Sequence, residues 1–261
     1  MCRMVVYAGE RGPVAPVMYG GEHSLHDQSF RPKEMMNGSL NADGYAVAWY
    51  HEGQPVRVAD DRPIWQNGDL EQMLGTVQST MAVAGVRNAS PGMPYGLAEV
   101  APMILDRWTF TLNGYVRDFR PRFMREFRRD LPDPLYGVIR GTSDTETLFL
   151  MAMVEVERGL SLSAALASVA RTAIAAVNRE GLDAQLNMAL TDGESAAVTR
   201  AGSLDRSNSL YVAEASPLFA HGTLVASEPL DENTTWQAVG HDRVVELIPG
   251  KELTIRDLST F

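Results

Sequence analysis

The chain opens with MCRMVVYA (residues 1–8), where its single cysteine, Cys2, comes directly before an apolar run. The run predicts a buried strand over residues 3–8 that carries Cys2 at its end. We expect Met1 to be removed because the next residue is small, which leaves a thiol and a free α-amine on one residue. An α-amine has a pKa of about 7.7–8.0 and can take the proton of an adjacent thiol. Cys2 can thus supply both nucleophile and base, although a cysteine near a terminus is also common as an ordinary surface or core residue.

Composition and charge limit the kinds of protein that this chain can be. A chain of 261 residues, 45% hydrophobic and 21% charged, is typical of a globular protein with a substantial core. Its net charge of −10 argues against partners such as nucleic acid or anionic membranes, which need a basic surface. A lone cysteine cannot form an internal disulfide, and no apolar run is long enough to cross a membrane. We therefore expect a cytoplasmic location.

The chain contains no linker, repeat or low-complexity segment, so we predict one domain over residues 2–261. Hydrophobic periodicity gives strands, two central helices and strands again, which predicts two sheets with helices outside, an α/β-layered fold. The Asn-Gly pair at 113–114 predicts a tight hairpin turn, with residues 115–119 returning as a strand. The predicted strands are 3–8, 45–50, 55–59, 81–87 and 107–114, with further short strands from residue 184, and the predicted helices are 69–80, 122–130, 145–159 and 161–179.

Two short motifs carry groups that can bind or stabilise an anion. Arg87 ends a predicted strand in GVRNASPG (85–92), a setting that suits two-pronged capture of a carboxylate. Taken alone, the same arginine is more simply explained as part of a surface salt bridge. In LNG (112–114), an Asn amide and a backbone N–H can point at a developing oxyanion, but a plain hairpin turn is the alternative.

A third motif, GTSDTE (141–146), comes directly before a predicted helix. Ser143 or Asp144 can cap that helix, with Glu146 in its first turn. A carboxylate at this position can also pair with a substrate ammonium, and the two roles are compatible. The segment NADGYAVAW (41–49) contains an Asp-Gly pair that is ordinary turn chemistry before a strand.

Metal and cofactor motifs do not stand out in this sequence. The chain has no phosphate-binding or dinucleotide-binding glycine motif and no carboxylate pair typical of glycosidases. Its histidines lack the spacing of a metal-ligand set. We therefore predict no metal and no cofactor. The histidines are His23, His26, His51, His221 and His241.

The order of these motifs is more informative than any one of them. Cys2-Arg3, VRNASPG (86–92), LNG and GTSDTE resemble, in this order, the landmarks of the class II (N-terminal cysteine) glutamine amidotransferases, which have the Ntn-hydrolase fold. Further stretches resemble the branch of γ-glutamyl-hercynylcysteine sulfoxide hydrolases of ergothioneine biosynthesis. They are GEHSLHDQSFRPKEMMNGSLNADGYAVAWYH (21–51), DRPIW (61–65), LNMALTDG (186–193) and LVASEPLDENTTW (224–236).

This resemblance implies both a fold and a reaction. The fold is α+β: an αββα sandwich of two antiparallel sheets between helical layers. The reaction is hydrolysis of a small-molecule γ-glutamyl amide through a γ-glutamyl thioester on Cys2, with the α-amine of Cys2 as the general base. The implied site consists of Cys2 with Asn113 and Gly114 as the oxyanion hole, Arg87 and Ser90 at the substrate α-carboxylate, and Asp144 at its α-ammonium.

Two positions depart from the family pattern. Leu112 replaces the usual histidine before Asn-Gly, and Tyr45-Ala46 replaces an aromatic-glycine step. We expect activity to survive because the oxyanion donors are retained, whereas the substrate pocket can differ. The implied leaving group carries a trimethylammonium, which aromatic faces bind well. Tyr45, Trp49 and Trp65 are candidates for that contact, with core packing as the alternative for each.

Two other functions fit the same motifs. One is a stand-alone glutaminase subunit that supplies ammonia to a partner synthase, and the other is an inactive protein that binds γ-glutamyl compounds. The chain ends soon after the hydrolase segment, so we expect a stand-alone hydrolase instead of an ammonia-channelling synthase. Retention of the nucleophile together with all the implied binding residues argues against an inactive protein.

Overall fold

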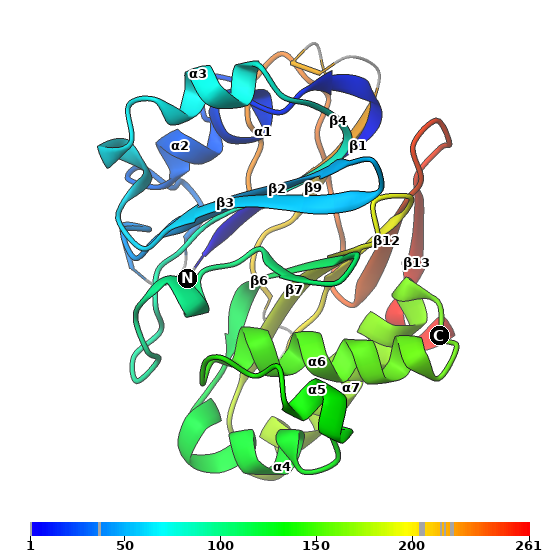
Figure 1. Ribbon diagram of the computed structural model, residues 1–261. Coiled ribbons are helices and arrows are strands. Elements are labelled where there is room, and N and C mark those ends of the chain that lie inside the picture. The colour runs from blue at the N-terminus through cyan, green and yellow to red at the C-terminus, as the bar shows by residue number, and fades with distance from the viewer. Residues whose placement is uncertain (1, 36–37, 204–206, 215, 217, 220–221) are drawn as a thin grey trace.

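The computed structural model describes residues 2–35, 38–203, 207–214, 216, 218–219 and 222–261. Within these residues, two antiparallel β-sheets lie face to face between two layers of helices (Figure 1). This is the αββα arrangement that the resemblance implies, and the α+β prediction is confirmed. Met1 and His221, which enter the sequence predictions, lie outside the described residues.

The strand that follows Cys2 lies in the middle of the first sheet. The order in this sheet is β11-β9-β10-β1-β4-β2-β3, so β1 is paired on both edges. A strand covered on both faces explains the nearly continuous apolar run at the start of the sequence. The strands are β1 (Arg3–Pro13), β2 (Tyr45–His51), β3 (Gln54–Asp60), β4 (Gln78–Val86), β9 (Tyr211–Glu214), β10 (Gly222–Ala226) and β11 (Gln237–Ala238).

The second sheet has the order β13-β12-β8-β7-β6-β5 and lies below the first in the view of Figure 1. Most of it comes from the last third of the chain, where the sequence predicted alternating strands and turns. Its strands are β5 (Met103–Leu105), β6 (Trp108–Val116), β7 (Ala184–Thr191), β8 (Ala196–Arg200), β12 (Arg243–Leu247) and β13 (Thr254–Asp257).

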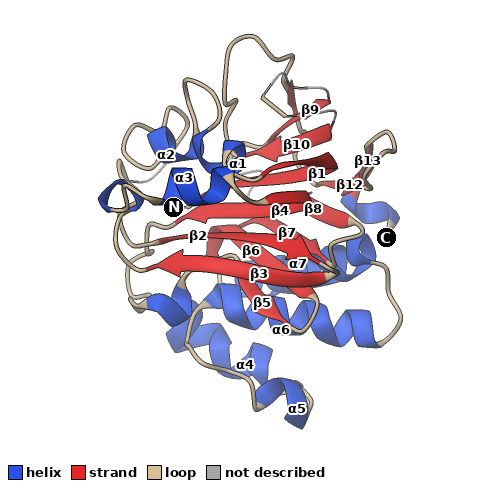
Figure 2. Ribbon diagram, turned by 45° about the horizontal axis from the view of Figure 1, so that its top comes forward, coloured by secondary structure: helices blue, strands red, loops and turns tan. Residues whose placement is uncertain are grey.

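Helices cover the outer face of each sheet (Figure 2). Short helices α1 (Pro16–Tyr19), α2 (Leu25–Gln28) and α3 (Leu70–Gly75) cover the first sheet. The second sheet is covered by α4 (Met124–Arg128), α5 (Asp133–Tyr136) and the two long helices α6 (Asp144–Glu157) and α7 (Leu162–Arg179). The predicted helix over 122–130 is shorter than expected, since a π-helical turn (Phe119–Phe123) precedes α4. Single turns of 3-10 helix lie at Ile64–Gln66, Leu97–Glu99 and Leu258–Thr260.

Side chains of β1 alternate between two cores. Val5 and Tyr7 belong to the core between the first sheet and α1–α3, whereas Met4 and Val6 belong to the core between the two sheets. The same alternation puts Arg3 on the helix-facing side and directs Cys2 toward the second sheet. Cys2 and Arg3 therefore face different environments.

The predicted Asn-Gly hairpin is wrong. β6 continues through Asn113 and Gly114 to Val116, and these residues pair with β7 in the order Asn113↔Asn187 and Gly114↔Leu186. The turn that enters β6 lies earlier, at Asp106, which has a φ of 50°. Pairing with a strand some seventy residues away outweighs the local turn preference of Asn-Gly. Residues 115–119 therefore do not return as a hairpin strand.

The boundary between the predicted helix 69–80 and the strand 81–87 is also wrong. α3 ends at Gly75, and β4 begins at Gln78. Ser79 belongs to the strand because its hydroxyl accepts the backbone N–H of Tyr50 at 3.1 Å and donates to the Met81 carbonyl at 2.8 Å. These contacts within the sheet replace the helical turn that the apolar spacing predicted.

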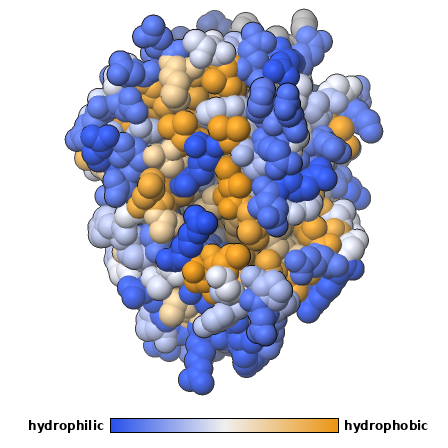
Figure 3. All heavy atoms as spheres, viewed as in Figure 1, coloured by the Kyte–Doolittle hydropathy of each residue, from blue (hydrophilic) through white to orange (hydrophobic). Residues whose placement is uncertain are grey.

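The surface seen in Figure 3 is hydrophilic around its border, with hydrophobic atoms gathered near its middle. Polar atoms interrupt this central zone, so it is not one continuous apolar patch. Among the described residues, no helix has the length and apolar character needed to span a lipid bilayer.

Candidate active site

Cys2 lies at the start of β1, beside the end of β4. Arg3 pairs with Val86, so the register places Cys2 next to Arg87 on the neighbouring strand. The thiol is partly exposed, and its Sγ lies 3.9 Å from the carbonyl oxygen of Asn88. The backbone ladder thus brings together two predicted site residues that are far apart in the sequence.

Arg87 is buried and only partly paired. Its side chain is 7% exposed, and its Nη2 donates to the carbonyl of Pro94 at 2.7 Å. Its Nη1 is buried and has no hydrogen-bond partner among the described residues. An unpaired buried donor costs about 1–3 kcal/mol, and more when it is charged. This guanidinium is therefore suited to binding an anion that comes from outside the protein. Among the described residues, Arg87 does not form the surface salt bridge that was the alternative interpretation of the sequence.

The NADG segment holds the loop that follows Arg87. The backbone N–H of Asp43 donates to the Arg87 carbonyl at 2.9 Å, and the Asp43 carboxylate accepts the N–H of Ala89 at 2.8 Å. Gly44 has a φ of 116°. A Cβ added there would lie 2.8 Å from the Asp60 carbonyl oxygen, so glycine is required by both conformation and space. Sequence reasoning treated this Asp-Gly pair as an ordinary turn and missed its role.

Asn113 lies on β6 and points toward the first sheet. Its Nδ2 donates to Ser227 Oγ at 2.9 Å, and Ser227 Oγ also accepts the backbone N–H of Met4 at 2.9 Å. The Asn208 amide donates to both the Oδ1 and the backbone oxygen of Asn113, at 3.1 Å each. The side-chain amide of Asn113 is thus oriented, and one of its two hydrogens stays available among the described residues.

Gly114 follows on the same strand, where space excludes any other residue. A Cβ at this position would lie 1.8 Å from the Gln185 carbonyl oxygen on the adjacent strand. Leu112, which precedes Asn113, points away from the Asn113 side chain and into the core beneath α6 and α7. The replacement of the family histidine by leucine therefore changes the helix-facing core and leaves the sheet-facing side of β6 unaltered.

Asp144 begins helix α6 behind the end of β6. Ser143 is the N-cap, because its hydroxyl accepts the N–H of Glu146 at 3.3 Å. The Asp144 carboxylate is buried and accepts the N–H of Val116 and of Thr145, both at 2.8 Å. Burial raises the pKa of this carboxyl, while the two N–H groups and the charge of Arg87 act in the opposite direction.

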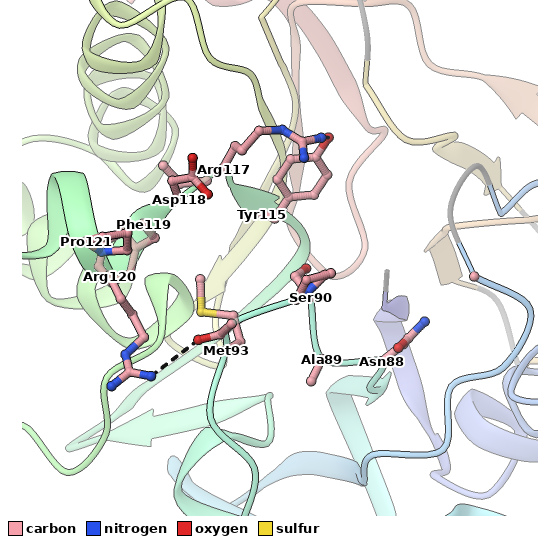
Figure 4. A pocket seen from close by; sticks show the side chains of 14 residues that line it. Asn88, Ala89, Ser90, Met93, Tyr115, Arg117, Asp118, Phe119, Arg120 and Pro121 are labelled. Carbon is pink, nitrogen blue, oxygen red and sulfur yellow. Dashed lines mark hydrogen bonds between the residues drawn. The ribbon is translucent and has the colours of Figure 1, made fainter.

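Ser90 lines a cavity of about 520 Å³ that opens beside these residues (Figure 4). Residues 88–93 form one wall, and residues 115–121 form the other. Arg120 bridges the walls by donating to the Gly92 carbonyl at 3.3 Å. Asn88 belongs to the first wall and contacts the Cys2 thiol, and Val116 in the second wall binds Asp144. Cys2, Arg87, Asn113, Gly114 and Asp144 are not among the residues that line this cavity; it adjoins Cys2 through Asn88 and Asp144 through Val116.

The aromatic candidates for a cation contact lie elsewhere. Tyr45 and Trp49 pack in the core between the first sheet and its helices, which is the alternative that the sequence left open. Trp65 is 41% exposed and meets Phe30 edge to face. Within the described residues, no three His, Cys, Asp or Glu side chains are grouped so as to hold a metal ion.

Comparison with known proteins identifies the family. A family model for class-II glutamine amidotransferases matches residues 23–221, which is more than half of the chain. The chain belongs to the class-II glutamine amidotransferases. It is therefore an amidohydrolase, and its N-terminal cysteine fits the nucleophile of Ntn-type members. The matched range contains five of the six predicted site residues, namely Arg87, Ser90, Asn113, Gly114 and Asp144.

Individual relatives agree with this amidotransferase family. The chain is 27% identical to the γ-glutamyl-hercynylcysteine sulfoxide hydrolase of Mycolicibacterium smegmatis, over 95% of this chain and 96% of that protein. The enzyme of the same name from Mycobacterium tuberculosis is 28% identical over 44% of this chain and 50% of its own length.

Solved amidotransferase structures share the fold at lower identity. A glutamine aminotransferase class-II domain protein from Silicibacter pomeroyi superposes with a TM-score of 0.69 at 22% identity, covering 98% of both chains. The glutamine phosphoribosylpyrophosphate amidotransferase of Bacillus subtilis gives a TM-score of 0.68 at 14% identity, over all of this chain and 50% of that one.

Proposed function

We propose that this amidotransferase hydrolyses a γ-glutamyl amide through a γ-glutamyl thioester on Cys2, and that residues 2–261 work as a single domain. One observation carries the proposal. The buried guanidinium of Arg87, with a nitrogen that lacks a partner among the described residues, lies beside Cys2, and its charge acts on the buried carboxylate of Asp144. A free amino-acid head carries one carboxylate and one ammonium and therefore matches this pair of charges.

In this proposal, the head group is held by three side chains. Arg87 binds the α-carboxylate with its free nitrogen, and the hydroxyl of Ser90 supports the same group from the cavity wall. Asp144 binds the α-ammonium, which offsets the cost of keeping its own charge buried. A head fixed at both charges directs the γ-carbonyl toward Cys2.

The proposed chemistry uses only groups on this chain and water. The α-amine of Cys2 takes the thiol proton, and the thiolate attacks the γ-carbonyl carbon. Asn113 Nδ2 and the backbone N–H of Gly114 stabilise the oxyanion. The C–N bond breaks, the proton passes from the α-ammonium to the leaving amine, and a thioester remains. Water, deprotonated by the same amine, then hydrolyses the thioester to glutamate and the free thiol.

The leaving group that we favour is large. The cavity whose wall includes Asn88, the residue in contact with the Cys2 thiol, has a volume of about 520 Å³, which is far more than ammonia needs. The relative matched over nearly its full length is named for hydrolysis of γ-glutamyl-hercynylcysteine sulfoxide. We infer that the chain removes glutamate from this compound, as a step of ergothioneine biosynthesis.

Glutamate release tests the proposal. Protein shown by intact mass to lack Met1 is offered γ-glutamyl-hercynylcysteine sulfoxide and glutamine in parallel, with Cys2→Ala as the blank. We expect release from the sulfoxide at a kcat/KM far above that for glutamine, and none from Cys2→Ala. Equal or faster use of glutamine would instead favour an ammonia-supplying glutaminase. No release from either substrate would favour a binding protein.

A further inference from the structure

A cluster of buried charges lies on the opposite face of β1 from the core between the sheets. Arg3 is fully buried, and its Nε donates to the Oε1 of Glu228 at 2.7 Å. The Oε2 of Glu228 meets His23 Nε2, also at 2.7 Å. The same carboxylate accepts the backbone N–H groups of Lys33 and Glu34, at 2.8 and 3.0 Å. Glu228 is therefore fully engaged and 1% exposed.

The cluster reaches the nucleophile through the backbone. Arg3 Nη1 donates to the carbonyl oxygen of Cys2 at 3.1 Å. Next to it, the Ser227 hydroxyl accepts the N–H of Met4, and the Ser227 N–H donates to the Met4 carbonyl at 3.0 Å. Because the ladder places β10 beside β1, the segment that follows β10 secures the first three residues after Met1.

Stability alone does not account for such a cluster. A buried ion pair must offset the loss of hydration of both charges, and apolar residues of similar volume are often as stable. An apolar pair cannot, however, donate a hydrogen bond to the Cys2 carbonyl. Burial raises the pKa of the Glu228 carboxyl, but the His23 hydrogen bond and the Arg3 charge outweigh it and hold the pKa at about 2. The carboxylate is thus charged at neutral pH.

We propose that Arg3 and Glu228 are positioning residues for the reaction: Glu228 fixes the guanidinium of Arg3, and Arg3 holds the Cys2 carbonyl. Cys2 precedes the first residue of β1, so its peptide lacks the full support of the sheet. Fixing its carbonyl orients the thiol and the α-amine together relative to Asn113. This proposal rests on the proposed function for its kinetic consequence only, since the ordering of Cys2 can be measured without turnover.

The kinetic test compares single and double variants. Arg3→Met and Glu228→Gln are each expected to lower kcat for glutamate release by about 10- to 100-fold while KM changes less than about threefold, because the bound head group is untouched. Each single variant also leaves one buried charge unpaired and lowers the urea midpoint. The double variant Arg3→Met/Glu228→Gln removes both charges and should recover much of the midpoint, but its kcat should stay low.

Recovery of kcat together with the midpoint in the double variant would overturn the positioning role, since the cluster would then serve stability alone. Glu246→Gln is the matched control. It removes a charge that Arg256 contacts at 2.6 Å on the second sheet, and it is expected to leave kcat within about twofold of the parent protein.

A second readout does not depend on turnover. Since Cys2 is the only cysteine, protein grown with [13Cβ]cysteine gives one labelled side chain. We expect one narrow Cβ resonance in the parent protein and in Glu246→Gln, and a broadened or multiple signal in Arg3→Met and in the double variant. An unchanged single resonance in those variants would refute the positioning role even if the proposed substrate were wrong.

Discussion

Arg3 and Arg87 lie on neighbouring strands, one register position apart, and both are buried. Each has one terminal nitrogen without a partner among the described residues. They differ in the anion that they meet. Arg3 contacts the carboxylate of Glu228 at 2.7 Å, whereas the hydrogen bond that the Arg87 guanidinium makes within the described residues is to the carbonyl of Pro94. Arg3 therefore binds an anion of the protein itself. We infer that Arg87 is available to bind the anion of a ligand.

The largest expected effect is the loss of catalysis when Arg87 is replaced. Arg87→Met should lower kcat/KM for γ-glutamyl substrates by about 1,000-fold, because a buried charge-assisted pair with the substrate is worth about 2–5 kcal/mol. Its unfolding free energy should change by less than about 1 kcal/mol, since its Nη1 has no partner among the described residues and the Asp144 carboxylate keeps its two backbone N–H donors. Steady-state kinetics and urea unfolding check the two parts. A large loss of stability would show that Arg87 is structural.

Arg3→Met should lower stability more than Arg87→Met does, and should lower catalysis less. Removing it leaves the Glu228 carboxylate buried without its cation, which typically costs about 3–5 kcal/mol of stability. Urea unfolding of this variant and of Arg87→Met, side by side, tests the contrast directly. Equal losses of stability in the two variants would contradict the proposed difference between Arg3, which is paired with Glu228, and Arg87, which is not paired with a protein carboxylate among the described residues.

The buried carboxylates of Glu228 and Asp144 should affect stability in opposite directions as the pH changes. Glu228 has a pKa of about 2 in the folded protein against about 4.5 ordinarily, so its stabilisation is complete above pH 4.5 and is lost as the pH falls toward 2. The full effect is about 3 kcal/mol. The raised pKa of Asp144 has the other sign, because its ionisation opposes folding as the pH rises.

Unfolding free energies between pH 2 and 7 check this contrast. Glu228→Gln should flatten the loss of stability on the acid side, and Asp144→Asn should leave that loss intact. If Glu228→Gln kept the full acid dependence of the parent protein, the low pKa assigned to Glu228 would be wrong.

The smallest expected effect is at the cavity wall. Ser90→Ala should raise KM about tenfold with little change in kcat, since one hydrogen bond to a charged carboxylate is worth about 1.5 kcal/mol. Initial-rate measurements over a range of substrate concentrations check this. A loss as large as that of Arg87→Met would place Ser90 in the chemical step.

The order of the motifs and the resemblance it carries single out Cys2, Arg87 and Asp144 in the sequence. The structure places Arg87 beside Cys2, and the Arg87 charge acts on the Asp144 carboxylate. Their catalytic roles remain predictions. The hairpin predicted at Asn113-Gly114 was wrong, because local turn preference says nothing about a partner strand that comes far later in the chain.

The partners of Arg3 could not be predicted from local pattern. Glu228 comes 225 residues later, and only the pairing of β1 with β10 brings it near. The segments that contain His23 and Glu228 did carry the family resemblance, which was the available signal. Asp43 was missed for a related reason, since its carboxylate serves a loop that lies beyond another strand.

The register between β1 and β4 has an evolutionary consequence. Neighbouring strands are held about 4.8 Å apart by the backbone itself, so the spacing of Cys2 and Arg87 does not depend on which side chains surround them. The walls of the adjoining cavity belong instead to residues 88–93 and 115–121, which lie outside that ladder. Descendants of such an enzyme can therefore exchange wall residues and acquire new leaving groups, while the glutamyl end of the substrate is inherited unchanged.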